Sequence, residues 1–194
     1  MDANDEKIQP HERAEAIAER LAFKSRFVLV FGEIDHAAAR LACTRLIALA
    51  EESDAPINVL ISSPGGHVES GDAIHDVIRF VRSPVTTIGT GWVASAGTHI
   101  FIAAPKERRV CLPNTRFMIH QPGGGAGGPA TDIAIQAKEI IKTRERIARV
   151  IARQTGQDLQ KVLADMERDF WMSADEAIQY GLVSKVIETS RDLA

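Results

Sequence analysis

One serine in this chain lies where nucleophilic chemistry is easiest to arrange. Ser95 follows an apolar and glycine-rich segment, and its neighbours Ala94, Ala96 and Gly97 are all small. A sharp turn from a strand into a helix at this point would expose the hydroxyl, and the small neighbours would let a substrate backbone approach it. The amide groups at the start of the following helix would face an oxyanion. A serine at such a junction also serves as a simple helix N-cap, and that reading remains open.

A nucleophilic serine needs a base, and His120 is the candidate. It follows the apolar run 117–119 at the end of a predicted strand, directly before a glycine-rich segment. A neutral imidazole is the usual partner for a serine hydroxyl. Asp169, between Arg168 and two aromatic residues, offers a carboxylate that could orient the imidazole and stabilise the imidazolium. The alternatives are a histidine bonded at the edge of the core and an aspartate that caps a helix or pairs with Arg168.

A second candidate segment is Ser63-Pro64-Gly65-Gly66, which follows a predicted buried strand over 57–62. It would lie at the carboxyl end of a parallel sheet, where ligands bind in open α/β folds. Glycines there would let an extended peptide pair with the backbone, and a free N–H would stabilise an oxyanion. The same glycines also fit an ordinary turn.

The other histidines do not predict a metal site. His11 and His36 lie near predicted helix starts, and His99 lies a turn into the helix after Ser95. His67 and His75 have a spacing too loose for metal ligands. We therefore predict neither a metal nor an organic cofactor.

Composition and charge exclude several classes of protein. The chain has 194 residues, of which 45% are hydrophobic and 25% charged, as in a domain that buries a core of its own. The net charge is -3 and no basic block is present, so nucleic acid is not expected as the main partner. No apolar stretch reaches the roughly 20 residues that cross a membrane, and the first residues are acidic, unlike a secretion signal.

The two cysteines agree with a cytoplasmic location. Cys43 and Cys111 cannot form a disulfide framework and have no CxxC spacing. We predict that both are small buried hydrophobic residues in a reducing compartment.

Strands and helices alternate along the first part of the chain. The patterns predict strands over 26–31, 57–62, 85–89 and 117–119 and helices over about 11–22, 36–50 and 70–81, with a short helix from about residue 95. Asp35 should cap the second helix, and Gly32 should end the strand before it. This alternation predicts an α/β fold with parallel strands and right-handed crossovers.

A long helix dominates the second part. Residues 122–129 are too rich in glycine for a fixed conformation and predict a mobile loop. Apolar residues over about 131–154 cover more than one face of a helix, which predicts packing against another subunit. A short helix to about residue 167 should follow, then a helix that Ser173 and Glu176 begin with a capping box and Gly181 ends, then a strand over 182–187.

In this set of residues the chain resembles the proteolytic subunits of Clp protease, which are self-compartmentalised serine peptidases with a crotonase-like fold. The resemblance covers about residues 27–187. Its carriers are Ser63-Pro64-Gly65-Gly66 with Gly71, Gly91-x-x-Ala94-Ser95-x-Gly97, Lys106-x-Arg108, Leu112-Pro113-Asn114, Met118-Ile119-His120-Gln121-Pro122, Thr131-Asp132-Ile133, Thr155-Gly156-Gln157, Arg168-Asp169 and the run from Ser173 to Val183.

The resemblance implies a mechanism and an assembly. Ser95 would be the nucleophile, His120 the base and then the acid, and Asp169 the orienting carboxylate, with the backbone N–H groups of Gly66 and Ala96 as the oxyanion hole. The fold would be a single domain over 1–194, a repeated β-β-α superhelix with a variable leader and helix over 1–25. The helix over 131–154 would protrude as the family's handle, which joins two heptameric rings into a tetradecamer.

This sequence departs from the family's pattern at several positions. Ala96 replaces a methionine and Val93 an alanine beside the nucleophile, which predicts altered substrate fit with hydrolysis retained. Asn58 and Leu60 stand where the family often has tyrosines that line the docking pocket for an AAA+ unfoldase, and the N-terminal region lacks the family's usual segment. An unfoldase partner of the usual kind is therefore less expected than hydrolysis itself.

Three functions compete for these residues. The first is a serine endopeptidase that cleaves unfolded polypeptides through an acyl-enzyme. The second is a catalytically silent or regulatory ring subunit of a mixed Clp complex, against which the retention of all three triad residue types argues. The third, a crotonase-fold enzyme acting on a CoA thioester, leaves the Ser-His-Asp set and the long helix unexplained.

Overall fold

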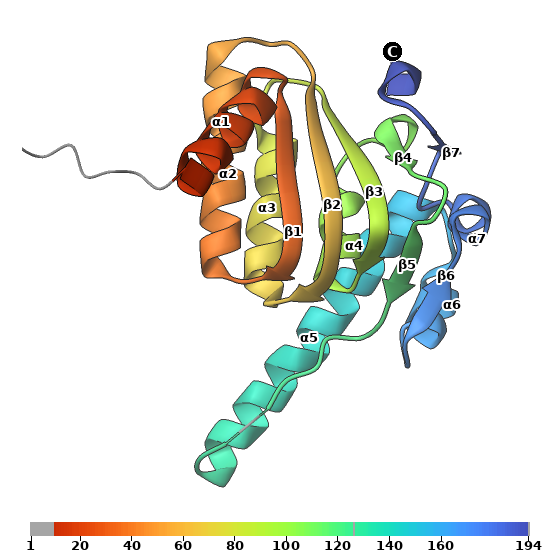
Figure 1. Ribbon diagram of the computed structural model, residues 1–194. Coiled ribbons are helices and arrows are strands. Elements are labelled where there is room, and N and C mark those ends of the chain that lie inside the picture. The colour runs from red at the N-terminus through yellow and green to blue at the C-terminus, as the bar shows by residue number, and fades with distance from the viewer. Residues whose placement is uncertain (1–9, 126, 194) are drawn as a thin grey trace, which may run out of the picture.

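The computed structural model describes residues 10–125 and 127–193, so most of the predicted leader lies outside the described residues. These residues form an α/β fold in which helices α2, α3 and α4 lie side by side against strands β1, β2 and β3 (Figure 1). Helix α5 runs from beside this layer out of the body of the molecule, and β5, β6, α6 and α7 flank its inner end.

Most of the strands are parallel, as the alternation predicts. The main order is β1-β2-β3-β4-β7, and β5 pairs with the end of β3. Strand β6 pairs antiparallel with β5, an exception that the alternation does not predict. The strands are β1 (Phe27–Ile34), β2 (Ile57–Gly66), β3 (Val85–Ala94), β4 (Arg109–Cys111), β5 (Arg116–Ile119), β6 (Phe170–Met172) and β7 (Lys185–Val186).

The predicted ends of the first three strands are wrong. Strand β1 passes through Gly32, which takes a φ of 78° at a bulge, and continues to Ile34. Strand β2 continues through the Ser63–Gly66 segment, and β3 reaches Ala94. Glycine and proline do not end these strands because their neighbours continue to pair, with Ile34 opposite Gly66 and Ser63 opposite Val93.

The helices agree closely with the sequence patterns. They are α1 (Pro10–Lys24), α2 (His36–Glu52), α3 (Val68–Phe80), α4 (Ala96–Phe101), α5 (Ala130–Thr155), α6 (Leu159–Asp165) and α7 (Ala174–Tyr180). The predicted caps are confirmed: Asp35 accepts the amide of Ala38 at 2.7 Å, and Ser173 and Glu176 form a capping box. The last strand is shorter than predicted because Leu182 still donates its N–H to Ala177 in completing the end of α7.

The two cysteines differ in burial. Cys111 is buried, as predicted, and burial raises the pKa of its thiol to about 11. Cys43 is only partly buried, so its assignment to the interior is wrong, although its thiol still lies 3.7 Å from the carbonyl of Ala73. Neither cysteine forms a disulfide.

Helix α5 has an exposed outer half and an anchored inner half. Every residue from 130 to 139 is exposed, whereas Ala148, Ile151 and Thr155 are buried against the body. Large apolar side chains in the outer part are open to solvent: Ile135 is 57% and Ile141 58% exposed. Residues 122–125 and 127–128, before this helix, are neither helix nor strand, and their mobility stays a prediction.

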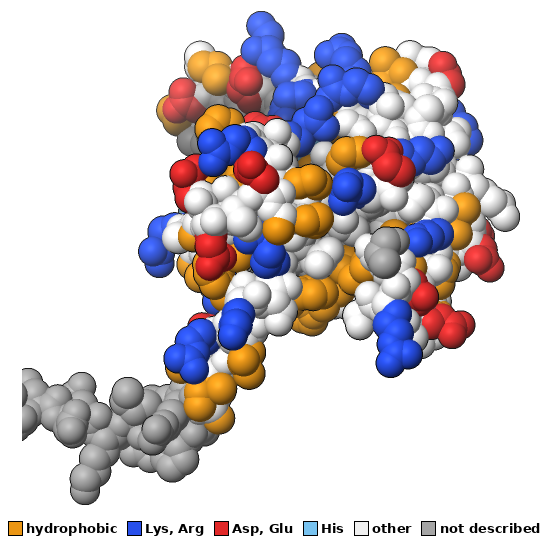
Figure 2. Space-filling model, turned by 90° about the horizontal axis from the view of Figure 1, so that it is seen from above, with side chains coloured by type: hydrophobic (Ala, Val, Ile, Leu, Met, Phe, Trp, Pro, Cys, Tyr) orange, Lys and Arg blue, Asp and Glu red, His pale blue; other side chains and the backbone are white. Residues whose placement is uncertain are grey.

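On the face seen from above, charged and hydrophobic side chains are intermixed. Acidic and basic side chains are interspersed there, and small groups of hydrophobic side chains lie between them (Figure 2). Exposed apolar residues therefore occur on the body as well as on α5, for example Phe31 at 54% and Phe80 at 81% exposure.

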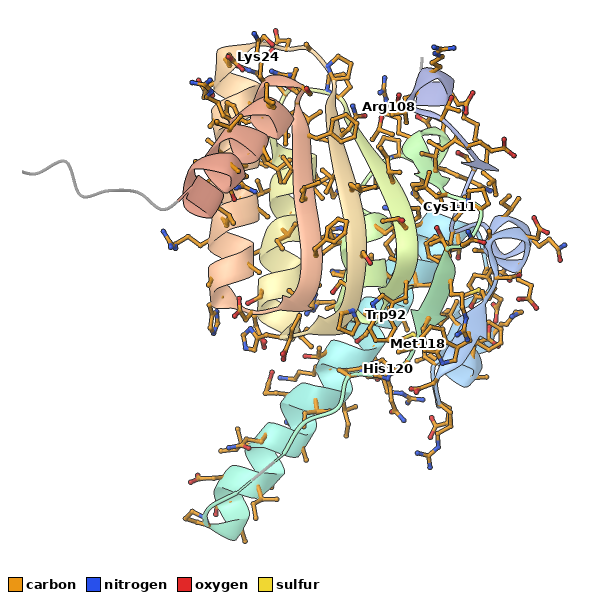
Figure 3. All side chains as sticks on the ribbon, in the orientation of Figure 1. Lys24, Trp92, Arg108, Cys111, Met118 and His120 are labelled. Carbon is orange, nitrogen blue, oxygen red and sulfur yellow. The ribbon has the colours of Figure 1, made fainter. Side chains whose placement is uncertain are left out.

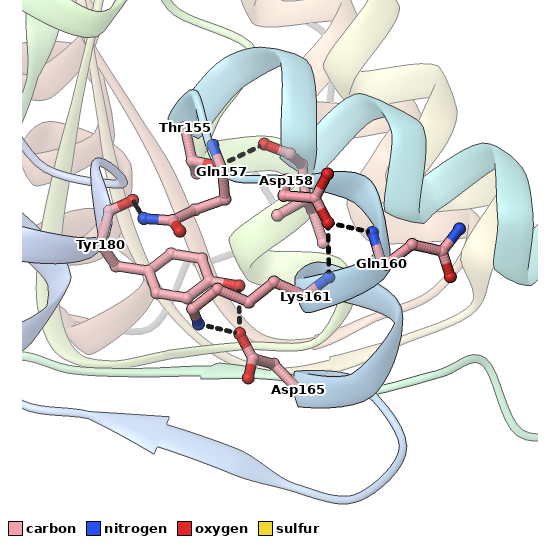
Figure 4. A network of polar contacts seen from close by, with 8 residues as sticks. Thr155, Gln157, Asp158, Gln160, Lys161, Asp165 and Tyr180 are labelled. Atoms are coloured by element: carbon pink, nitrogen blue, oxygen red, sulfur yellow. Dashed lines mark hydrogen bonds and ion pairs between the residues drawn. The ribbon is translucent and has the colours of Figure 1, made fainter.

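A polar network joins the inner end of α5 to α6 and α7 (Figure 4). Gln157 donates to the backbone carbonyl of Tyr180 at 3.0 Å, and the Tyr180 hydroxyl donates to Asp165 at 2.8 Å. Lys161 contacts the same carboxylate at 2.6 Å. Burial and this carboxylate raise the pKa of Tyr180, so its proton stays in the network. These contacts hold α6 in place, so the segment that follows it begins at a fixed position.

Candidate active site

Ser95 occupies the turn between β3 and α4 in an unusual backbone conformation. Its φ is 56° and its ψ -121°, values that a non-glycine residue adopts only where the surroundings impose them. Its N–H donates to the carbonyl of Met118 at 2.9 Å, which ties the turn to β5. The residue stands at the N-cap position, but its hydroxyl caps no amide of the helix. The hydroxyl is therefore available for another partner.

That partner is His120. Its Nε2 lies 2.8 Å from the Ser95 Oγ, and its Nδ1 lies 3.0 Å from Oδ1 of Asp169. The side chain of His120 is 33% exposed and that of Asp169 61% exposed. The structure thus brings the three predicted residues together in the serine–base–carboxylate order, although their catalytic roles stay a prediction.

Strand pairing places the histidine and the aspartate opposite each other. The β5–β6 register sets Ile119 against Phe170, so the residues just beyond them, His120 and Asp169, also face each other. Gln121 extends the contact, because its N–H donates to Met166 at 2.7 Å and its side chain to the carbonyl of Glu167 at 3.0 Å. His120 lies just past the end of β5 and beside α5 (Figure 3).

The glycines of the Ser63–Gly66 segment approach the nucleophile closely. A Cβ built on Gly65 would lie 2.6 Å from the Cβ of Ser95, and Gly65 has a φ of 101°. A Cβ on Gly66 would lie 2.3 Å from the carbonyl oxygen of Ile34. Only glycine therefore fits at either position, because of both the close contacts and the backbone conformation.

Two backbone amides near the serine, those of Gly66 and Ala96, are the candidates for the predicted oxyanion hole. The N–H of Gly65 is engaged with Ser63 Oγ at 3.0 Å, so Gly66 is the candidate donor from this segment. Ala96 is the first residue of α4, where amides have no partner within the helix. That these two groups hold an oxyanion stays a prediction.

A cavity opens beside the triad. Its walls come from α3, α4, β5 and α5, and most of them are apolar. The lining residues are Val68, Ser95, Ala96, His99, Ile119, His120, Pro122, Ile147 and Ile151.

One polar cluster next to this cavity is missed by the sequence patterns. His99 Nε2 lies 2.9 Å from Oδ1 of Asp72, and Arg146 donates to both oxygens of that carboxylate at 2.8 and 2.6 Å. The ring of His75 stacks on His99 with centroids 4.4 Å apart. The position of His99 one turn after Ser95 is the only hint in the sequence, because the other members come from different helices.

An aromatic pair lies on β3 and β6, the strands that lead to Ser95 and follow Asp169. Trp92 and Trp171 stack with ring centroids 6.5 Å apart, and the guanidinium of Arg116 lies 4.4 Å from the Trp171 ring. Trp92 is 46% exposed and lies on β3 three residues before the nucleophile. Figure 3 shows it close to Met118 on β5.

The described residues contain neither a metal-binding cluster nor a helix that could span a membrane. Over 10–125 and 127–193, no group of three or more His, Cys, Asp or Glu side chains is arranged to bind a metal ion. Among the helices in those ranges, none combines the length and the apolar character needed to cross a membrane.

Comparisons with known proteins place the chain in a family. The family model for Clp protease matches residues 9–190. The chain is 54% identical over 171 residues to the ATP-dependent Clp protease proteolytic subunit 3 of Rhizobium etli, covering 88% of each chain. It is 60% identical over 173 residues to proteolytic subunit 2 of Gluconobacter oxydans, covering 88% of this chain and 78% of the relative.

A solved structure extends the similarity to three dimensions. The N165D mutant of ClpP1 from Listeria monocytogenes superposes with a TM-score of 0.85 at 48% identity, covering 92% of this chain and 99% of that chain. This match confirms the predicted ClpP-like α/β fold with its long helix. By sequence and by structure, the chain belongs to the Clp protease family of proteolytic subunits.

Proposed function

We propose that Ser95, His120 and Asp169 carry out the peptide hydrolysis expected of this serine protease family. The observation that supports this proposal is a pair of contacts made by the His120 imidazole. Its Nε2 lies 2.8 Å from Ser95 Oγ, and its Nδ1 lies 3.0 Å from Asp169 Oδ1. A histidine so placed can accept the serine proton on Nε2 while its Nδ1–H donates to the carboxylate.

The reaction then divides into two acyl transfers. Ser95 Oγ attacks the peptide carbonyl as its proton moves to His120 Nε2, and the same proton passes to the leaving amine. Water, activated by His120, next attacks the ester and releases the acyl fragment. The amides of Gly66 and Ala96 would stabilise the oxyanion in both steps, which the closeness of the Ser63–Gly66 segment to Ser95 supports. No step uses a metal or an organic cofactor.

Assembly into rings is the second part of the proposal. We propose that copies of the chain form heptameric rings that stack as a tetradecamer through the handle, helix α5. The support is the exposed outer half of this helix with its apolar residues Ile133, Ile135 and Ile141. The whole chain would act as one peptidase domain, and unfolded polypeptides would be its substrates.

An ATPase or a paralogous subunit is the proposed further partner. The named relatives are described as ATP-dependent, which supports an AAA+ unfoldase. In this chain Asn58 lies in a surface pocket together with charged residues such as Glu107, Arg108 and Lys185. A partner would therefore dock on a more polar surface than tyrosines would provide. The free thiols of Cys43 and Cys111 suit the proposed cytoplasmic location.

The decisive experiment is labelling with a fluorophosphonate followed by intact-mass spectrometry, because this probe reacts with a serine already activated by its base. A single adduct that is absent in Ser95→Ala is expected, with both proteins eluting at the same volume from a sizing column. Ser184→Ala, a change at another serine remote from the triad, should leave labelling intact. An unlabelled wild type that still assembles would favour the silent ring subunit instead.

A further inference from the structure

Helix α4, which follows Ser95 directly, is too short to be stable by itself. It has six residues, Ala96–Phe101, and a helix of this length does not persist alone in water. The backbone of Ser95 at its start has a φ of 56°, a conformation that lasts only where the surroundings impose it. Contacts between α4 and its neighbours therefore help to hold Ser95 in this conformation.

His99 connects the backbone of Ser95 to helix α3. Its N–H donates to the carbonyl of Ser95 at 3.1 Å, and its Nε2 lies 2.9 Å from Oδ1 of Asp72. The carbonyl oxygen of His99 lies 2.8 Å from Nδ1 of His75, and the two rings stack. Because the side chain of His99 is only 7% exposed, solvent does not compete for these contacts.

Asp72 joins three helices through one carboxylate. It belongs to α3, and it binds His99 of α4 and both terminal nitrogens of Arg146 of α5, the latter at 2.8 and 2.6 Å. Burial raises the pKa of Asp72, but hydrogen bonds from His99 and Arg146 outweigh it and hold that pKa well below its usual range. The carboxylate is therefore ionised, and Nε2 of His99 donates to it.

The contact with Asp72 is the one hydrogen bond that the His99 ring makes among the described residues. Its Nδ1 is one of two buried side-chain nitrogen or oxygen atoms in that part of the chain without a partner, the other being Arg144 Nε. Without the carboxylate, a buried imidazole would have no hydrogen bond at all, which is costly in a folded protein. The ring would then be held by packing alone, and α4 would be less firmly fixed.

We propose that Asp72 is a positioning residue for Ser95: through His99 it fixes α4 against α3 and α5, and so holds the serine where its hydroxyl meets His120. This inference rests on the proposed role of Ser95. Asp72 does not line the cavity beside the serine, so its effect passes through His99. Arg146 keeps the carboxylate ionised and oriented, which extends the same support to the inner half of α5.

Time courses of fluorophosphonate labelling, followed by intact-mass spectrometry of the assembled protein, test this proposal. The rate constant reports how well Ser95 is placed, whereas the final labelled fraction reports how many subunits fold with a triad. We expect Asp72→Leu and His99→Leu to lower the rate constant about tenfold, the effect of one buried hydrogen bond, with a final fraction near that of the wild type. Their double variant should be no slower than either single variant, because both changes remove the same contact.

Conservative variants and surface controls accompany these changes. His99→Gln can place an amide N–H near the Nε2 position and should recover most of the rate. Asp72→Asn keeps an uncharged acceptor and should lie between Asp72→Leu and the wild type. Arg146→Gln should slow labelling severalfold. Asp76→Leu, at an exposed position one turn along α3, and Arg149→Gln, at a surface ion pair with Glu145, should label at the wild-type rate.

The outcomes separate this inference from the proposed function. Rate constants within twofold of the wild type in Asp72→Leu and His99→Leu overturn the proposal. A lower final fraction at an unchanged rate constant also overturns it, because Asp72 then serves folding alone. If a leucine variant fails to assemble, Asp72→Asn decides: slower labelling to a full final fraction supports the proposal, and wild-type labelling refutes it. A wild type that assembles but neither labels nor hydrolyses peptides would instead refute the role of Ser95.

Discussion

Replacement of Asp169 by asparagine tests the triad in its most exposed member. The carboxylate lies 3.0 Å from His120 Nδ1. At this distance a full charge pair is worth about 1.4 kcal/mol in a medium like water and about 5.5 kcal/mol at an effective dielectric constant near 20. Because the Asp169 side chain is 61% exposed, the lower figure applies more closely. Each 1.4 kcal/mol is a factor of ten in rate, so Asp169→Asn should lower kcat/KM by about 10- to 100-fold.

The assay is hydrolysis of a fluorogenic peptide by the assembled protein, with the active fraction counted by fluorophosphonate adduct. Asp175→Asn is the matched control, because it removes an exposed carboxylate from the nearby helix α7 and should change kcat/KM less than twofold. A loss below threefold in Asp169→Asn would refute the orienting role of the carboxylate. A loss beyond about 10⁴-fold would show that solvent does not screen the pair and that assembly buries it.

Three other changes have expected outcomes. Gly65→Ala places a Cβ 2.6 Å from that of Ser95, so fluorophosphonate labelling should disappear, and labelling at the wild-type rate would contradict the packing argument. The pKa of His75 is lowered to about 4, so the unfolded chain binds more protons below pH 6.5; stability should fall by about 2 kcal/mol between pH 7 and pH 5. Thermal melts of His75→Phe should lose this slope, and an identical pH dependence would disprove its origin. Ile141→Asp puts a charge on the exposed apolar part of α5 and should convert double rings into single rings on a sizing column, whereas Lys138→Ala should not.

The pattern of the fold was predictable wherever local signals agree with each other. Asp35 and the Ser173–Glu176 box mark helix starts because their hydrogen bonds are made within a few residues. Strand ends are not predictable in the same way, because pairing with a neighbouring strand overrides the local signal of glycine, as at Gly32. Strand β4 is not predictable from the sequence, because it has only three residues and one of them is the charged Arg109. The buried side chain of Arg109 bonds to Gln154 of α5, a partner distant in sequence.

The candidate site likewise has a part that local sequence patterns predict and a part that they do not. Ser95, His120 and Asp169 were identifiable because residue type and local position indicate their chemistry, and the resemblance to one family implies the roles proposed for them. The contact of His99 with Asp72 was not, because it depends on how α3 packs against α4. Packing between helices is set by the whole core, and no short pattern in the sequence encodes it.

In the exposed outer half of α5, the residues needed for folding of one subunit are separate from the residues available for contact with a neighbour. Because every residue from 130 to 139 is exposed, substitutions there leave the buried core of the protomer untouched. The folding of one subunit therefore places little constraint on these positions, and in the proposed assembly the contact with a neighbouring copy would be their main constraint. If the proposed ring contact is made by this segment, changes confined to it would alter which copies of the chain associate, while the interior of each copy and the position of Ser95 stay the same.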